Sequence, residues 1–164
     1  MRPLLLTLLI SALLCVPLRA QTATSGLSRA ENLNQTVFGL GFSAGWASGI
    51  GLSFRAHLPS KSSLQVVFGI IRTSDKLSAS IGGEYQYDLV RGGTSRFFAG
   101  AAMCYEYYGK DQNEVNGPIR TGLGIGGEFN IQESLHVTVE GMFTFFSDGR
   151  VIPLPQAALH YYFN

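Results

Sequence analysis

The sequence predicts an all-β protein: an eight-stranded antiparallel up-and-down transmembrane β-barrel preceded by a cleaved signal peptide. Three observations predict it. From Val37 onward, apolar residues alternate with small or polar ones, a period of two that is typical of strands whose faces meet different surroundings. Only 14% of the 164 residues are charged, whereas soluble domains carry about 25%. After residue 20, no apolar run approaches the ~20 residues that a membrane helix needs.

Composition excludes several other classes of protein. The chain is 46% hydrophobic and 12% aromatic, which is too apolar for intrinsic disorder. A formal net charge of +1 argues against a nucleic-acid partner. The two cysteines, Cys15 near the N-terminus and Cys104 in the body, exclude a disulfide scaffold and a Cys-rich zinc site.

The first twenty residues have the pattern of a secretory signal peptide. Arg2 precedes an apolar core from Leu4 to Val16, and the small residue Ala20 follows at a plausible cleavage point. The core is too short to span a bilayer comfortably. Residues 21–36 are polar and without periodicity, so we expect a leader there and the barrel over residues 37–164.

Eight segments carry the alternation, separated by short connections with turn residues. Only the connection Gly109–Gly117 is longer, so each strand is expected to pair with its sequence neighbour in a meander. The expected strands are Val37–Ala47, Gly49–Leu58, Ser63–Arg72, Leu77–Leu89, Arg96–Tyr108, Ile119–Ile131, Leu135–Phe146 and Val151–Phe163.

The two strand faces differ in a way that predicts which one is inside. The apolar faces carry many more large side chains than the dozen or so, on the order of three layers of four, that fill an eight-strand core. The opposite faces are dominated by Gly, Ser and Ala with scattered charges, which suits a cramped interior. We therefore expect the apolar face to meet lipid and the sheet to close, because an open edge in hydrocarbon leaves backbone groups unpaired.

Aromatic residues on the apolar faces are expected to form two girdles at the membrane interfaces. With the N-terminus on the periplasmic side, the periplasmic girdle comprises Phe38, Phe54, Tyr85, Tyr87, Phe97, Phe129, Tyr161 and Phe163. The outer girdle comprises Trp46, Tyr105, Tyr107, Phe143 and Phe145.

With this architecture and the terminal segment Leu159-His160-Tyr161-Tyr162-Phe163, residues 37–163 resemble the small eight-stranded bacterial outer-membrane barrels, the OmpA-transmembrane/OmpX-like group. The resemblance implies that the outer-membrane assembly machinery reads Tyr161 and Phe163. The chain departs from the group in ending with Asn164. It also carries Pro153 and Pro155, which remove two donors and weaken the prediction for the start of the last strand.

The inward charges are expected to pair across neighbouring strands. Symmetric hairpins set Glu106 opposite Arg120, Asp88 opposite Arg96, and Glu128 opposite His136. The lumen is thus either a gated polar path or a plug of ion pairs, and the small diameter of eight strands favours the plug. The predicted lumen network is Arg55, Glu84, Asp88, Arg96, Glu106, Arg120, Glu128, His136 and Glu140.

No catalytic, metal or cofactor site is predicted. His136, Thr138 and Glu140 have the residue types of the triad in outer-membrane lipid A deacylases, but they are expected inward and near the periplasm, away from the outer leaflet. His57, His136 and His160 could meet at one end as a metal site, yet they lack motif spacing. Hydrogen bonding in the interior is the preferred interpretation for all three histidines.

The expected function is therefore a structural or envelope-integrity role as a monomer with a plugged lumen. Its partners would be outer-membrane lipid and the assembly machinery. The alternatives are a porin-like transporter of small or apolar solutes, through the barrel or a lateral opening, and a lipid-modifying enzyme. The outer connections near Ser48, Ser74 and Asp148 are too short to build a binding surface, which leaves only Lys110–Asn116 for contacting a partner.

Overall fold

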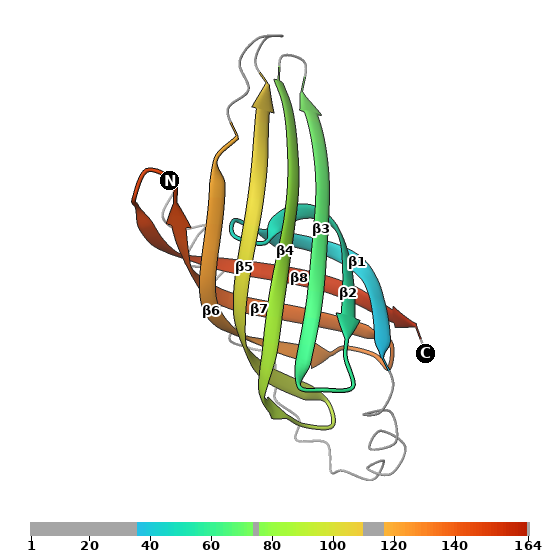
Figure 1. Cartoon of the computed structure of the whole chain (residues 1–164). Helices are drawn as coiled ribbons and strands as arrows, with labels where there is room; N and C mark the ends of the chain where they lie inside the picture. Colours follow the sequence, from blue (N-terminus) through green and yellow to red (C-terminus); the bar gives the residue numbers. More distant parts are fainter. Residues whose placement is uncertain (1–35, 74–75, 110–116, 164) are drawn as a thin grey trace, which may run out of the picture.

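The computed structural model describes residues 36–73, 76–109 and 117–163, which form one closed antiparallel barrel (Figure 1). The all-β up-and-down architecture is confirmed, and each predicted strand end lies within two residues of the observed one. No helix among the described residues is long and apolar enough to cross a membrane. The strands are β1 (Val37–Gly45), β2 (Gly49–His57), β3 (Ser62–Thr73), β4 (Lys76–Arg91), β5 (Ser95–Gly109), β6 (Ile119–Asn130), β7 (Leu135–Phe146) and β8 (Val151–Phe163).

Several predicted segments lie outside the described residues. They are the signal peptide 1–20, the leader up to residue 35, the turn at residues 74–75 and the connection at residues 110–116.

The barrel closes where the first and last strands meet. Phe38 to Ala44 of β1 pair with Ala157 to Phe163 of β8, while the opposite edge of β1 pairs with β2. We call the end that carries Val37 and Phe163 the terminal end, and the opposite end, which holds the β1–β2 connection, the far end.

Alternation along each strand sorts the side chains as predicted, with apolar groups outside. Ile70 is 79% exposed and Ile125 is 68% exposed, whereas Arg55 and His160 are fully buried. This is the reverse of a soluble barrel, in which the apolar residues would fill the interior. The outer surface is therefore suited to hydrocarbon and the interior to polar contacts.

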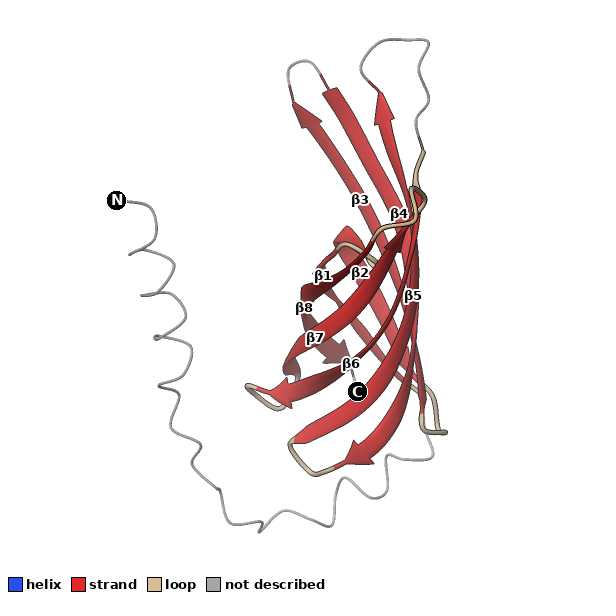
Figure 2. Ribbon diagram, turned by 90° about the vertical axis from the view of Figure 1, so that its left-hand side faces the viewer, coloured by secondary structure: helices blue, strands red, loops and turns tan. Residues whose placement is uncertain are grey.

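The wall of the barrel is uneven in height. β4 has 16 residues and β5 has 15, whereas β1 and β2 have nine each. The strands β3, β4 and β5 extend past the rest of the barrel at the far end (Figure 2). The β2–β3 pairing stops at Phe68, so Gly69–Thr73 pair with β4 alone.

β8 is continuous in spite of its two prolines. Pro153 and Pro155 align with Phe143 and Gly141 of β7, in a part of β8 that has no partner in β1. A proline in this stretch removes no hydrogen bond to β1, which explains why the strand tolerates both of them.

Candidate functional site: the closed lumen

One buried carboxylate organises the terminal half of the lumen. Glu128 of β6 is 3% exposed, and its Oε2 accepts hydrogen bonds from Arg55 Nη1 at 2.7 Å and Arg96 Nη2 at 2.8 Å. Its Oε1 lies 2.7 Å from Nδ1 of His136, and Tyr162 donates its hydroxyl to Oε2 at 3.3 Å. The carboxylate is thus surrounded by donors from β2, β5, β7 and β8. We call Glu128 and these partners the Glu128 cluster.

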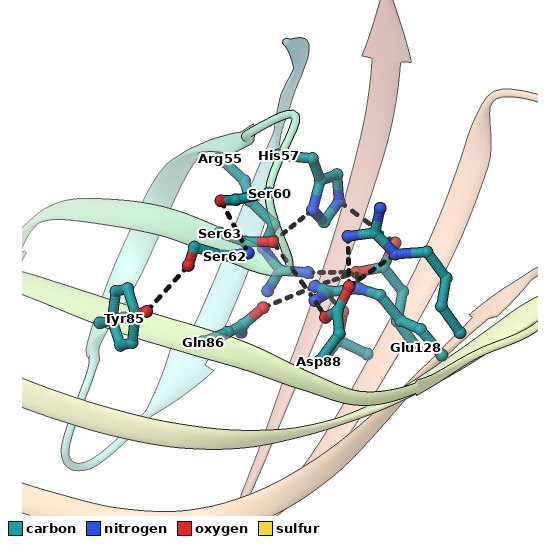
Figure 3. Close-up of polar contacts among 12 residues, drawn as sticks. Arg55, His57, Ser60, Ser62, Ser63, Tyr85, Gln86, Asp88 and Glu128 are labelled. Carbon is teal, nitrogen blue, oxygen red and sulfur yellow. Dashed lines mark hydrogen bonds and ion pairs between the residues drawn. The ribbon is translucent and has the colours of Figure 1, made fainter. Parts of the chain in front are cut away.

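The two arginines of the Glu128 cluster extend it across the lumen, and Figure 3 labels Arg55 and Glu128 among these contacts. Arg55 donates to Gln65 Oε1 at 2.8 Å and to Thr138 Oγ1 at 2.8 Å. Arg96 donates to Asp88 Oδ1 at 2.6 Å and to Gln86 Oε1 at 2.5 Å. Because Arg guanidinium groups are planar with several fixed donors, each can tie more than two strands together.

His57 closes the terminal end of the lumen beside the Glu128 cluster. Its Nδ1 lies 2.6 Å from Ser63 Oγ and its Nε2 lies 2.7 Å from the Tyr162 hydroxyl. The imidazole and the Tyr162 ring stack with centroids 4.9 Å apart. Polar and aromatic contacts therefore fill the lumen at this end.

Two carboxylates lie together in the middle of the lumen. The amide nitrogen of Gln86 is 2.6 Å from Glu84 Oε1 and 3.4 Å from Glu140 Oε1, so all three side chains form one group. Glu84 is 4% exposed and Glu140 is 5% exposed. The Oε2 atom of each carboxylate has no hydrogen-bond partner among the described residues.

The connection between β1 and β2 folds into the far half of the lumen. Ala47 is fully buried and Ser48 is 1% exposed, although both belong to a turn at the end of a barrel. The backbone N–H groups of Ala47 and Ser48, and the Ser48 hydroxyl, all donate to Gln156 Oε1 at 3.1 Å. We call Trp46–Ser48 the inner turn.

The inner turn reaches the opposite wall of the barrel. Ala47 packs with Ala102 of β5 and Met142 of β7, and Figure 1 shows the β1–β2 hairpin bending across toward β5 and β6. A Cβ added to Gly122 of β6 would lie 2.5 Å from that of Ala47, and one added to Gly82 of β4 would overlap the Ser48 carbonyl. The absence of side chains at Gly122 and Gly82 therefore leaves the space that the inner turn fills.

At the mouth of the far end, Arg120 of β6 forms an ion pair with Glu106 of β5. Its guanidinium carbon lies 5.0 Å from the ring centroid of Trp46 and 5.5 Å from that of Phe146. The strand thus ends at Gly45, two residues before its predicted end, and the Trp46 ring, 45% exposed, contacts a lumen arginine. Its place in the outer girdle stays a prediction.

The three predicted pairs are all in contact, but the predicted register is wrong. Asp88 aligns with Phe98 and not with Arg96, because the β4–β5 turn sets Arg91 opposite Arg96; a bulge after Asp88 then changes the register by one residue. Glu128 aligns with Thr138, two residues from His136. Glu106 likewise pairs with Arg120 diagonally, since Arg120 aligns with Cys104. Long side chains bridge diagonal positions of a sheet, so the contacts form in spite of the shift.

The three residues of the possible hydrolase triad, His136, Thr138 and Glu140, each contact a different side chain of the lumen. His136 contacts Glu128, Thr138 accepts from Arg55, and Glu140 lies beside Gln86. The three possible metal ligands do meet at the terminal end: the rings of His57, His136 and His160 lie 4.9, 4.5 and 6.1 Å from the ring of Tyr162. Their ring nitrogens contact hydrogen-bonding side chains, with His160 Nε2 2.8 Å from Ser53 Oγ. No group of three or more His, Cys, Asp or Glu side chains in the described ranges is arranged to hold a metal ion.

Gln65, Gln86 and Tyr162 belong to this site, although the predicted network did not include them. The alternation had already placed Gln86 and Tyr162 on the inward face. Gln65 lies in the segment where apolar residues on both faces obscure the pattern.

The remaining predicted aromatic residues lie on the strands with their side chains outward. Tyr107 is half-buried, and the others range from 39% exposed for Phe145 to 58% for Phe143. Phe38 and Phe54 stack at 5.7 Å, and Phe97 meets Phe129 edge to face at 6.1 Å. Their division into two membrane levels stays a prediction.

An exposed ion pair marks the β7–β8 turn outside the barrel wall. Asp148 accepts from the backbone N–H of Arg150 at 3.1 Å and from its Nε at 2.6 Å. The backbone N–H bond, with the guanidinium beside it, lowers the pKa of the Asp148 carboxyl below its ordinary value.

Comparison with known proteins supports the fold but does not identify a family. No protein-family model matches the chain, and no curated protein matches it. Among solved structures, it is similar to a major outer membrane protein from Thermus thermophilus, with a TM-score of 0.50 and 10% sequence identity. The similarity covers 79% of this chain and 100% of the Thermus chain. The chain thus has the fold of an outer-membrane β-barrel protein.

Proposed function

We propose that this protein is a monomeric outer-membrane β-barrel with a structural role in the envelope and a lumen closed by its own side chains. The observation that carries the proposal is closure of the lumen at two levels. The Glu128 cluster fills the terminal half, and the inner turn fills the far half. A solute passing along the barrel axis would have to disrupt both the contacts of the Glu128 cluster and those of the inner turn.

The outward apolar surface supports placement in the outer membrane. We assign the terminal end to the periplasm and the far end to the cell exterior, as expected for a chain exported behind a signal peptide. Membership in the OmpA-transmembrane/OmpX-like group belongs to the same proposal. So does recognition of Tyr161 and Phe163 by the assembly machinery; both side chains are 52% exposed on the outer face of β8.

The contacts in the lumen favour a structural role over catalysis. Each polar group of the possible triad has a structural partner: His136 contacts Glu128, Thr138 accepts from Arg55, and Glu140 lies beside Gln86. A well-connected polar interior holds several strands in one arrangement, which suits a protein whose contribution is mechanical.

Planar-bilayer recording tests the proposal. Purified protein inserted into a bilayer is expected to give no steady unitary current steps, and bilayers treated with the same detergent without protein supply the baseline. Reproducible steps of constant size from the wild-type protein would contradict the closed lumen and favour the porin-like transporter. Mass spectrometry of lipid A from cells with and without the protein is expected to show no difference; a change would favour the lipid-modifying enzyme.

A further inference from the structure

The inner turn is held very differently on its two sides. On the side of β8, three donors converge on one acceptor, Gln156 Oε1. On the opposite wall, Ala47 packs against the apolar side chains of Ala102 and Met142. The Trp46 ring also contacts the Arg120 guanidinium at the mouth. The hydrogen bonds of the turn to the wall nevertheless form one group, which the loss of one acceptor would break.

The backbone on either side of the inner turn permits the turn to move. Gly45 precedes the turn, and Gly49 follows it with a φ of 103°, in the left-handed region that glycine adopts readily. Gly51 has a φ of 147°. Glycines at both ends of a short segment lower the cost of changing its backbone direction.

Behind the inner turn lies a native thiol. Cys104 of β5 is 2% exposed, and a Cβ added to Gly49 would lie 3.6 Å from its Sγ. The side chains of Glu84 and Glu140 occupy the middle of the same lumen. Moving the turn outward would therefore uncover Cys104 and open the far half of the lumen toward the central carboxylates.

We propose that the inner turn is a latched lid, with Gln156 as the latch, that opens the far half of the lumen to the exterior. The proposal rests on the closed lumen described above and adds that the two closures are of different kinds. The Glu128 cluster is a fixed plug joined to strands all around the barrel. The inner turn is a movable one: its hydrogen bonds to the wall converge on one side chain, Gln156, and its other contacts are the packing of Ala47 and the contact of the Trp46 ring with Arg120.

The native thiol reports directly on the lid. The folded protein in detergent is treated with a charged maleimide, and the rate of Cys104 modification is followed by mass spectrometry. The wild type is expected to react slowly. Gln156→Ala removes the acceptor of all three hydrogen bonds and is expected to react at least tenfold faster. Ser48→Ala removes one donor and is expected to give a smaller increase.

Gln65→Ala is the matched control, because Gln65 is also a buried lumen glutamine but lies in the terminal half beside Arg55. It is expected to leave the labelling rate at the wild-type value. Cys104→Ser gives the background, including any reaction at Cys15. Far-UV circular dichroism verifies that each variant is folded, and Ser48→Ala alone decides the question if Gln156→Ala does not fold.

Three outcomes would overturn the lid. They are unchanged labelling in the folded latch variants, equal acceleration in Gln65→Ala, and wild-type labelling as fast as that of the unfolded chain. Labelling does not depend on ion conduction, so this result is separate from the bilayer recording. Steady current from the wild type would defeat the closed lumen, while the labelling rates would still show whether the turn opens.

Discussion

At the scale of single residues, Glu128 has the most consequential position in the molecule. Its carboxylate offsets the charge of two buried arginines, Arg55 and Arg96, which are 0% and 7% exposed. Removing one partner from a buried ion pair is costly because the remaining charge is left without compensation in a poorly hydrated site. The charge of Glu128 therefore matters more than its volume.

Glu128→Gln is accordingly expected to reduce the free energy of unfolding by about 3–5 kcal/mol. The measurement is a urea titration in detergent micelles followed by tryptophan fluorescence and circular dichroism. Glu133→Gln removes the same charge from an exposed turn next to β7 and should leave the midpoint unchanged. Equal effects of the two substitutions would contradict the central role of Glu128.

A weaker effect is expected at the mouth of the far end. Arg120→Ala leaves the Glu106 carboxylate, 12% exposed, without its ion-pair partner and removes the contacts with Trp46 and Phe146. We expect a loss of about 1–3 kcal/mol, the cost of stranding a largely buried polar group. Arg150→Ala, which breaks an ion pair that water screens, should barely change the same unfolding curve. An unchanged midpoint in Arg120→Ala would mean that Glu106 is solvated in the folded state.

The sequence identified these ion pairs through residue types on one face, but it could not supply their register. Symmetric hairpins placed Glu128 directly opposite His136, whereas the barrel aligns it with Thr138. In β4, the turn sets Arg91 opposite Arg96, and a bulge after Asp88 changes the register again by one residue. Both depend on how the turns and the neighbouring strands pack together, which is not written in the alternation of any single segment.

At the scale of elements, the inner turn explains why two inward positions on the wall opposite it are glycine. Gly122 faces Ala47 and Gly82 faces the Ser48 carbonyl, so neither position has room for a side chain. The alternation predicted a strand to Ala47 with Trp46 outward. A period of two describes the faces of a strand and does not reveal that the chain leaves the wall after Gly45.

Gly122→Ala is expected to destabilise the protein by about 1–3 kcal/mol, because the added methyl group would overlap Ala47 in a filled lumen. Thermal unfolding in detergent measures the effect. Gly141→Ala is the matched control, since a Cβ there meets nothing within 4 Å, and it should be neutral or slightly stabilising. Similar losses in both variants would point to a general intolerance of β7 and β6 to alanine and not to contact with the turn.

At the scale of the whole molecule, the distribution of apolar surface determines where the chain can exist as a folded monomer. Phe42, Ile70 and Ile125 are all more than 60% exposed, and they belong to a surface that covers the barrel on all sides. A soluble monomer does not present apolar surface of this extent. The fold and its inside-out arrangement could be predicted from sequence because every strand repeats the same signal.

We therefore expect the folded barrel to require detergent or lipid. Dilution below the critical micelle concentration should cause aggregation, which light scattering and size-exclusion chromatography measure. The same dilution into buffer that keeps detergent above this concentration should prevent aggregation. A monodisperse monomer in plain buffer with native circular dichroism would contradict the membrane assignment.

The pairing of β1 with β8 has a consequence for how the molecule is made. The seam joins residues 38–44 to residues 157–163, so the second edge of β1 stays unpaired until β8 has been synthesised. Until then, every partial product keeps two unpaired edges, and hydrocarbon does not tolerate them. Closure of the barrel must consequently follow the synthesis of β8, and a chain that stops upstream of Ala157 leaves this edge of β1 without its partner.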